Sequence, residues 1–340
     1  VQEGGCELLC TLSRSVEWER AFLSRDAVGF IVTAMRSHLR MPDVQRKACW
    51  ALAGFAANEE IRGVILRSFG LEPILAALRE YCGKDFQPEV CEQACAAISA
   101  LSVSVEARST VANTGTEVQV LDCVSLSSYP ALQAQALSAV GNLAVDDRLR
   151  ARLLEKNGVF RILDVLRFQT HEPRHCHLGC LALANLAHDP QGRLQLKQNN
   201  GVAVVAACLR KHTHHAGVAE QACAVFCNVG SNENDTKLIA DNEGVEMVVG
   251  ALRIHLRSGN PKAVESACFA LTKFVALPAA AAYEMYARAM VRDGAVELLR
   301  QVNKSDDCTF DTRVCTNVLL RKLVGQKDRL DVLGGVGAGG

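Results

Sequence analysis

Large apolar residues recur along this chain at helical spacing, and the pattern repeats every 42 to 49 residues. Three segments share one ending, an asparagine between apolar residues, at Asn142, Asn185 and Asn228, with 43 residues between neighbours. A fixed period of this length is typical of a solenoid of stacked repeats. We call the equivalent position of each repeat its anchor. The eight anchors are Thr11, Gly54, Ala100, Asn142, Asn185, Asn228, Lys273 and Lys322.

The residues before each anchor predict a long helix. From Gly54 onward, the residues two positions before the anchor and one position after it are large and apolar. Such spacing, beside a column of small residues, describes a helix that is buried along one side and approached closely by its neighbours. The small residues lie six positions before the anchor: Ala48, Ala94, Ala136, Gly179, Ala222, Ala267 and Thr316.

A glycine follows most anchors at a distance of about 16 residues. An apolar run after it predicts a second helix, and the shorter segment before it, such as residues 148–155, predicts a first helix. We expect the glycine to redirect the chain through a positive φ, which glycine tolerates at a helix end. A longer interval predicts an insertion near residues 278–290, which either lengthens a first helix or alters one edge of the groove discussed below. The glycines are Gly70, Gly115, Gly158, Gly201, Gly244 and Gly294.

Three helices per period and the ending A-x-A-L-x-N-L-A resemble the armadillo repeat family, of the β-catenin and importin-α type. The resemblance covers residues 1–325. It implies an all-α, right-handed superhelical armadillo-repeat solenoid, with about seven three-helix repeats and a partial N-terminal repeat. We expect the glycine-rich residues 326–340 to form a flexible tail. Because the chain opens without Met inside the end of a third helix, at residues 6–13, we expect it to be part of a longer protein.

In that family the third helices line a concave groove, where asparagines hydrogen-bond the backbone of an extended peptide. The resemblance implies this role for Asn142, Asn185 and Asn228, since a carboxamide offers both donor and acceptor. The residues themselves leave an alternative open, in which these asparagines cap helices or bond neighbouring helices. The resemblance also implies that Trp50, Gln135 and Gln221 lie at the groove, and that Phe269 and Lys273, which replace the pattern toward the C-terminal end, form a separate anchor there.

The chain departs from the family's nuclear-import members, which carry a tryptophan four residues before each asparagine. The equivalent residues here are Ser138, Leu181 and Ala224, and only Trp50 fits that position, before the anchor Gly54. We therefore do not expect recognition of import signals. The neighbouring groove column is polar without a basic stripe, so a cationic groove for acidic partners is not expected either. That column reads Lys47, Gln93, Gln135, Leu178, Gln221 and Ser266.

Two groups of histidines fall in the links between second and third helices of consecutive repeats. Imidazoles at one edge can form a metal site or a pH-sensitive contact. The alternative, which we favour, is exposed polar loops, because no acidic or thiolate partner is fixed beside them. These weak candidates for metal ligands are His171, His175 and His177 in one link, and His212, His214 and His215 in the next.

Five of the 15 cysteines share one column, five residues before the anchor. Free cysteine packs as a small buried hydrophobe, so the column favours core packing over zinc binding or disulfides. Unpaired cysteines in this number fit a reducing compartment inside the cell. We expect the cytoplasm, with the nucleus or a cilium as alternatives. The five are Cys49, Cys95, Cys180, Cys223 and Cys268.

Charge and motifs narrow the class of function. The 37 basic and 37 acidic residues balance, which gives no general attraction for nucleic acid. No apolar run is long enough to predict a membrane span, and no nucleotide, zinc-protease or serine-hydrolase motif is present. We expect a non-enzymatic scaffold, without cofactor or small-molecule substrate, that binds a protein or peptide along the third helices. The alternative is a structural module docked in a larger cytoskeletal, ciliary or other assembly through its edge or convex surfaces.

Overall fold

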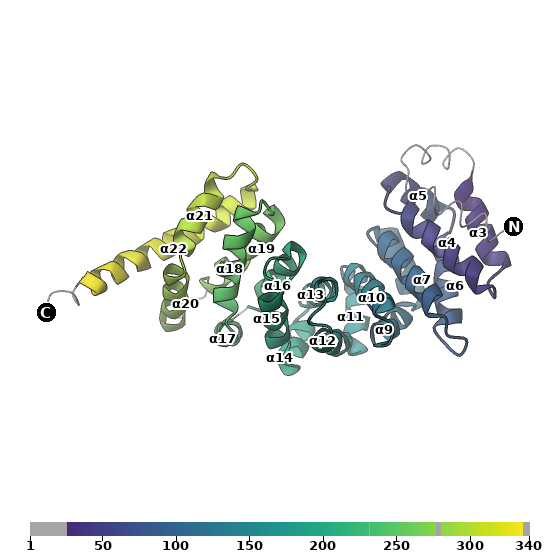
Figure 1. Cartoon of the computed structure of the whole chain (residues 1–340), viewed down its shortest axis with the longest axis horizontal. Coiled ribbons are helices and arrows are strands. Elements are labelled where there is room, and N and C mark those ends of the chain that lie inside the picture. Colours follow the sequence, from purple (N-terminus) through teal and green to yellow (C-terminus); the bar gives the residue numbers. More distant parts are fainter. Residues whose placement is uncertain (1–25, 231, 277–279, 336–340) are drawn as a thin grey trace. The chain divides into compact units, whose positions relative to one another are not determined.

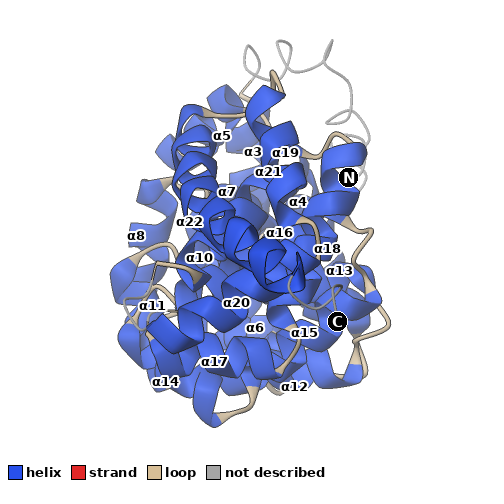
Figure 2. Cartoon of the chain, turned by 90° about the vertical axis from the view of Figure 1, so that its left-hand side faces the viewer, coloured by secondary structure: helices blue, strands red, loops and turns tan. Residues whose placement is uncertain are grey.

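Every regular element in the described part of the chain is an α-helix (Figures 1 and 2). The computed structural model describes residues 26–230, 232–276 and 280–335. The anchor Thr11 with its predicted partial repeat, Pro278 of the insertion, and residues 336–340 of the tail lie outside the described residues. The chain divides into two compact units, Val1–Val165 and Leu166–Gly340, with the boundary inside α12.

The predicted third helices form, and most of them begin at a proline. Proline suits the first helical position because its fixed φ matches the helix. It also lacks an N–H, which at that position would have no acceptor within the helix. In the first unit α4, α7 and α10 pack side by side, and in the second unit α13, α16, α19 and α22 do so (Figure 1). The third helices are α4 (Pro42–Phe55), α7 (Pro88–Leu101), α10 (Pro130–Leu143), α13 (Pro173–Leu186), α16 (Ala216–Val229), α19 (Pro261–Phe274) and α22 (Phe310–Gly335).

First and second helices alternate with these in the predicted order. The described residues hold six complete sets of three helices, preceded by α3 and α4. The first helices are α5 (Glu59–Arg67), α8 (Val105–Thr114), α11 (Asp147–Glu155), α14 (Pro190–Gln198), α17 (Glu233–Asp241) and α20 (Ala280–Arg292). The second helices are α3 (Ala27–Ser37), α6 (Leu71–Tyr81), α9 (Glu117–Val124), α12 (Gly158–Phe168), α15 (Gly201–Lys211), α18 (Gly244–Arg257) and α21 (Ala295–Lys304).

The explanation given above for the landmark glycines is wrong at most of them. A positive φ occurs at Gly115 and Gly294, but elsewhere the residue before the glycine adopts it, as Asn157 does with φ 58°. Gly158 and Gly244 are needed instead for close approach. A Cβ on Gly244 would lie 2.8 Å from the carbonyl oxygen of Ile239, at the end of α17. The glycine thus lets the second helix start directly against the end of the first.

The small and large columns of the third helices form the core as predicted. All residues six positions before the anchor are buried, and a Cβ on Gly179 would lie 2.6 Å from Leu166. The large apolar residues around the anchors are likewise buried, except the half-buried Leu320 on the last helix. The five cysteines of the column are free thiols, each with 0% exposure. Their thiols therefore pack as apolar groups, as the column predicted.

Two boundaries at the C-terminal end differ from expectation or refine it. Helix α22 continues to Gly335, beyond the predicted tail boundary at residue 326. The glycines begin only at Gly334, and the residues before them are mostly good helix formers. The predicted insertion coincides with α20, which has 13 residues where the other first helices have 9 or 10. This favours a lengthened first helix. No described helix has the length and apolar character needed to cross a bilayer.

Candidate partner-binding surface

Each third helix turns one strip of half-buried or exposed residues outward. The strip comprises the positions seven and four before the anchor and the anchor itself, and we call it the third-helix surface. In the first unit its predicted binding residues are Trp50, Gln135 and Asn142, and in the second unit they are Asn185, Gln221, Asn228, Phe269 and Lys273. Trp50 is 36% exposed, Lys273 is exposed, and the other six are half-buried.

Asn142 braces the preceding third helix of the first unit. Its Nδ2 donates to the carbonyl oxygen of Ser99 at 2.9 Å and lies 3.1 Å from the Ser99 hydroxyl. Ser99 is in the last turn of α7, where helical carbonyls lack their usual backbone partner. The Ser99 hydroxyl is also 2.8 Å from that of Ser138, one turn before Asn142. The anchor side chain therefore completes a polar contact between two repeats.

Asn228 makes the same contact in the second unit. Its Nδ2 donates to the carbonyl oxygen of Ala184 at 2.9 Å, in the last turn of α13. In a continuous α-helix the N–H of His188 would donate to the Ala184 carbonyl. Here that N–H donates to the carbonyl of Asn185 instead. Asn228 thus satisfies an acceptor that the end of the helix leaves open.

The last anchor makes a comparable contact through a different side chain. Lys322 donates through Nζ to the carbonyl oxygen of Val275 at 2.6 Å, just after the end of α19. Asn185 lies half-buried at the equivalent position of α13. The helix-to-helix bond that the sequence left as an alternative is therefore present at Asn142 and Asn228.

Each bracing asparagine keeps hydrogen-bonding capacity for a partner. A carboxamide has two N–H donors and two acceptor lone pairs, and the contacts of Asn142 and Asn228 each employ Nδ2. Both side chains remain partly exposed. Phe269 and Lys273, one helical turn apart on α19, add an apolar and a cationic group to the surface of the second unit.

Two glutamines of this surface are held by acidic neighbours. Gln221 donates from Nε2 to Glu220 at 2.9 Å, and Gln93 makes the equivalent contact to Glu92 at 3.1 Å. Burial raises the pKa of the Glu220 carboxyl above its ordinary value, while the charge of Lys262 opposes that change. The two carboxylates lie eight residues before their anchors, next to the polar column.

Two further columns were missed from sequence. An arginine eight residues after the anchor donates to a carbonyl at the end of the same third helix, as Arg150 does to Ala144 at 3.0 Å. Its charge also suits the negative end of the helix dipole. A glutamine nine residues before the anchor, Gln45 or Gln133, is buried and donates to carbonyls at the end of the second helix. Spacing from the anchor would have shown the arginines, which are Arg62, Arg108, Arg150 and Arg193.

The comparisons with solved structures decide the fold. An engineered protein solved by a structural genomics consortium is 19% identical with a TM-score of 0.61, over 76% of this chain and 97% of its own. A designed armadillo repeat protein is 14% identical with a TM-score of 0.60, over 72% and 98%. A second designed armadillo repeat protein, in complex with the peptide (KR)4, is 13% identical with a TM-score of 0.58, also over 72% and 98%. No protein-family model and no curated protein matches the sequence.

The fold is an armadillo-like repeat solenoid. This is the fold that the resemblance predicted, and at these identities the likeness concerns the fold alone.

Two of the predicted histidine positions need correction. His175 and His177 lie inside α13, not in the link, because Pro173 starts that helix two residues earlier. His171 and His214 are exposed in the links of their armadillo repeats.

The ring nitrogens of the next repeat's histidines serve the fold. His212 donates from Nε2 to the carbonyl of Thr170 at 2.8 Å, and His215 accepts the N–H of Val218 at Nδ1 as the cap of α16. The rings of His177 and His215 lie 6.0 Å apart. No group of three potential metal ligands is found among the described residues.

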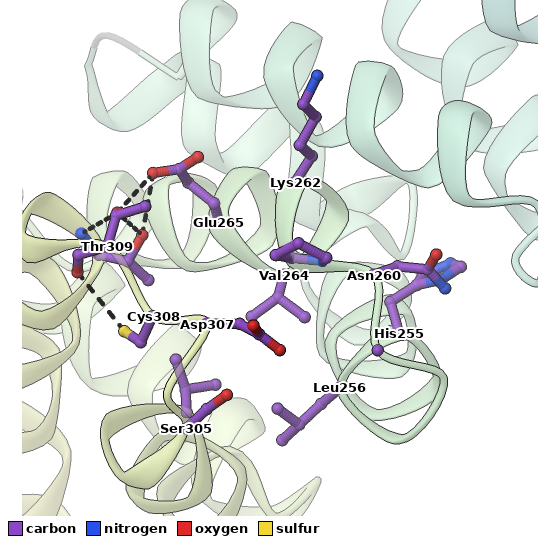
Figure 3. A pocket seen from close by; sticks show the side chains of 14 residues that line it. His255, Leu256, Asn260, Lys262, Val264, Glu265, Ser305, Asp307, Cys308 and Thr309 are labelled. Carbon is purple, nitrogen blue, oxygen red and sulfur yellow. Dashed lines mark hydrogen bonds between the residues drawn. The ribbon is translucent and has the colours of Figure 1, made fainter.

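A cavity of about 320 Å³ opens between two consecutive repeats of the second unit (Figure 3). It lies where the end of α18, the start of α19 and the link before α22 meet. The hydroxyls of Thr309 and Thr312 donate to the Glu265 carboxylate at 2.8 and 3.0 Å. Figure 3 shows Lys262 pointing away from the cavity.

Cys308 and His255 both line this cavity, but they do not form a catalytic pair. The Nε2 of His255 donates to the carbonyl of Thr213 at 2.7 Å, and its Nδ1 is 3.2 Å from the amide nitrogen of Asn260. The Cys308 thiol donates to the carbonyl of Thr309 at 3.6 Å. Burial lowers the pKa of His255, which favours its neutral ring. The lining thus shows polar groups that are bonded to the fold rather than a converging nucleophile and base.

Proposed function

We propose that this protein is a non-enzymatic scaffold that binds an extended segment of a partner protein along the third-helix surface. The supporting observation is a partly exposed carboxamide in each unit, Asn142 in the first and Asn228 in the second, which braces the preceding third helix through Nδ2 and leaves Oδ1 for a partner. The backbone N–H groups of a peptide can donate hydrogen bonds to such oxygens. Asn185 supplies a further carboxamide in the second unit.

The chemistry of the partner differs from that of the alternating Lys-Arg peptide bound by one of the similar designed proteins. The tryptophans that the import members of the family place four residues before the asparagine are replaced here by Ser138, Leu181 and Ala224. Phe269 beside Lys273 instead suits a segment with an apolar side chain next to an acidic one. We expect a protein or peptide partner, and neither nucleic acid nor a small-molecule substrate.

The free cysteines support a reducing compartment for this scaffold. Thirteen cysteines of the described residues are free, and most are buried. Such thiols persist where glutathione and thioredoxin keep proteins reduced. We therefore place the protein inside the cell, in the cytoplasm first, with the nucleus and the cilium as alternatives.

Peptide selection tests the proposal without a known partner. A random library displayed on phage is selected on the wild-type protein, and the dissociation constants of selected peptides are measured by fluorescence polarisation. The double variant Phe269→Ala, Lys273→Ala removes two side chains of the surface, and Leu194→Ala is the control, since that side chain is 42% exposed on the first helix α14.

We expect the double variant to weaken binding at least about tenfold, the size of a loss of about 1.4 kcal/mol, and the control to bind as wild type does. Selection of no peptide, or equal binding by the double variant and wild type, contradicts the proposal for the second unit.

Exposed phenylalanines support one alternative function. In the first unit Phe30 on α3 is 71% exposed and Phe160 on α12 is 49% exposed, both on second helices. Exposed aromatic side chains are frequent anchors of protein interfaces. A structural module docked in a larger cytoskeletal, ciliary or other assembly through the second helices of this unit would lose its partner in Phe30→Ser and Phe160→Ser. The variant of Phe269 and Lys273 would keep it, so the two functions are distinguishable.

A further inference from the structure

Three cysteines of the first unit come together where two consecutive repeats meet. Cys82 caps the end of the second helix α6, Cys91 lies on the third helix α7, and Cys123 lies on the second helix α9 of the next repeat. The Sγ atoms of Cys82 and Cys123 are 3.7 Å apart, and both residues are free thiols. None of the three belongs to the cysteine column five residues before the anchor, so that column does not explain them.

Exposure distinguishes the three thiols. Cys91 and Cys123 have 0% exposure, whereas Cys82 is half-buried at the end of its helix. A small oxidant in the solvent therefore reaches Cys82 first. Cys82 also contacts the carbonyl of Gln119 at 3.9 Å, so its thiol already lies against α9.

Hydrogen bonding within the group distinguishes them further. The thiol of Cys123, and next that of Cys91, lowers the pKa of Cys82 below its ordinary value. The pKa of Cys123 is raised, first by its hydrogen bond with Cys82. The pKa of Cys91 is raised as well, first by its hydrogen bond with Cys123. Thiolate character and access are what make a cysteine reactive, and both favour Cys82.

The second unit contains an internal comparison. Cys176 and Cys208 are 32 residues apart, as are Cys91 and Cys123, and they occupy the same two helices of their repeats. The hydrogen bond with Cys208, and then burial, raises the pKa of Cys176. Both are fully buried. This pair shares the position between repeats but has no partly exposed thiol beside it.

The geometry points to Cys82 and Cys123 as a redox-sensitive pair that hydrogen peroxide converts to a disulfide joining two consecutive repeats. The two sulfurs, now 3.7 Å apart, must approach to about 2.05 Å. The bridge would tie the end of α6 to α9, the second helices of neighbouring repeats. Reduction by a dithiol would restore the thiols, so the modification is reversible.

The reaction takes one peroxide molecule. The Cys82 thiolate attacks a peroxide oxygen, so that an S–O bond forms and the O–O bond breaks, and the released hydroxide takes up the thiol proton as water. The Cys123 sulfur then attacks the sulfenic sulfur. The S–S bond forms, the S–O bond breaks, and a second water leaves with the Cys123 proton. The two thiols together lose two electrons, and the peroxide is reduced to two waters.

Peptide mapping of the whole chain tests this assignment. Reduced, desalted protein is treated with a few equivalents of hydrogen peroxide, the remaining thiols are blocked with N-ethylmaleimide, and the protein is digested with trypsin without reduction. Cleavage after Arg79, Lys84, Arg108 and Arg148 separates the three thiols. Cys82 falls in residues 80–84, Cys91 together with Cys95 in residues 85–108, and Cys123 in residues 109–148. We expect the first and third peptides to appear as one cross-linked species that dithiothreitol separates.

Two variants and the internal pair complete the experiment. Cys82→Ser should abolish the cross-link, and Cys91→Ser should leave it in place. The peptides that contain Cys176 and Cys208 should form at least about tenfold less cross-link in the same reaction, since neither thiol is accessible. A cross-link of the 85–108 peptide, which holds Cys91 and Cys95, to either of the other two peptides would overturn the assignment. So would over-oxidation of Cys82 without a bridge, or equal reaction of Cys176 with Cys208.

Discussion

Replacing Asn228 by alanine measures what the anchor contact contributes to the stack. The substitution removes the 2.9 Å hydrogen bond to the Ala184 carbonyl, an acceptor without a backbone donor. A typical intramolecular hydrogen bond contributes about 0.5 to 1.5 kcal/mol. Since the anchor is half-buried, water replaces part of the loss, and we expect the free energy of unfolding to fall by about 1 kcal/mol.

Aspartate at the same position sharpens the test. Asn228→Asp keeps the shape of the side chain but places a carboxylate oxygen against the Ala184 carbonyl oxygen. Two acceptors then face each other, and the charge loses part of its hydration. We expect a larger loss, about 2 kcal/mol.

Urea denaturation followed by far-ultraviolet circular dichroism provides the measurement, with an unchanged m-value showing that only stability changed. Asn234→Ala is the matched control, because Asn234 is exposed on α17 of the same unit and alanine is the better helix former. If Asn228→Ala behaved like Asn234→Ala, and Asn228→Asp were no less stable than Asn228→Ala, the anchor would not brace the helices.

Three further substitutions test other contacts by the same denaturation. Arg150→Ala should lower stability by about 1 to 2 kcal/mol, because a charged donor leaves a carbonyl at the end of α10, while Arg150→Lys should recover part of the loss. Gly244→Ala should cost about 1 to 3 kcal/mol through its clash with the end of α17, whereas Gly250→Ala in the same helix meets nothing within 4 Å and should stabilise by about 0.5 to 1 kcal/mol. Lys197→Met should cost about 1 to 3 kcal/mol, because it leaves the buried Asp235 carboxylate without the cation at 2.8 Å, and adding Asp235→Asn should restore part of it.

The repeat positions could be predicted from the sequence because burial follows helical periodicity. Every residue of the small column from Ala48 to Thr316 is buried, and each anchor from Gly54 to Lys322 lies on a third helix. The fold depends on the size and apolar character of the side chains at those positions, and the amino-acid sequence gives both properties directly. The armadillo-like architecture could therefore be predicted from the sequence.

The polar contacts between repeats were not accessible in the same way. Spacing places Asn142 on a third helix but does not state which atom of the preceding helix its amide meets. That partner depends on the offset between stacked helices, which brings the Ser99 carbonyl within 2.9 Å. The landmark glycines were misread for a similar reason. The sequence alone cannot distinguish a glycine that avoids a clash from a glycine that adopts a positive φ. Only the backbone geometry shows that Gly158 belongs to the first kind and Gly115 to the second.

The two roles of the anchor asparagines can be separated by magnitude. A domain of ordinary stability, about 5 to 15 kcal/mol, remains more than about 99% folded after losing about 1 kcal/mol at Asn228. Unfolding then cannot account for more than a small change in the apparent dissociation constant. A tenfold weaker affinity for a selected peptide corresponds to about 1.4 kcal/mol of binding energy. A loss of that size in Asn228→Ala, with the stability change found by denaturation, would come from the contact of the side chain with the peptide. The amide N–H of Asn228 braces α13, and its oxygen is left for the peptide. One substitution therefore removes a contribution to folding stability and a contribution to peptide affinity. Urea denaturation measures the first and the dissociation constant measures the second, independently of each other.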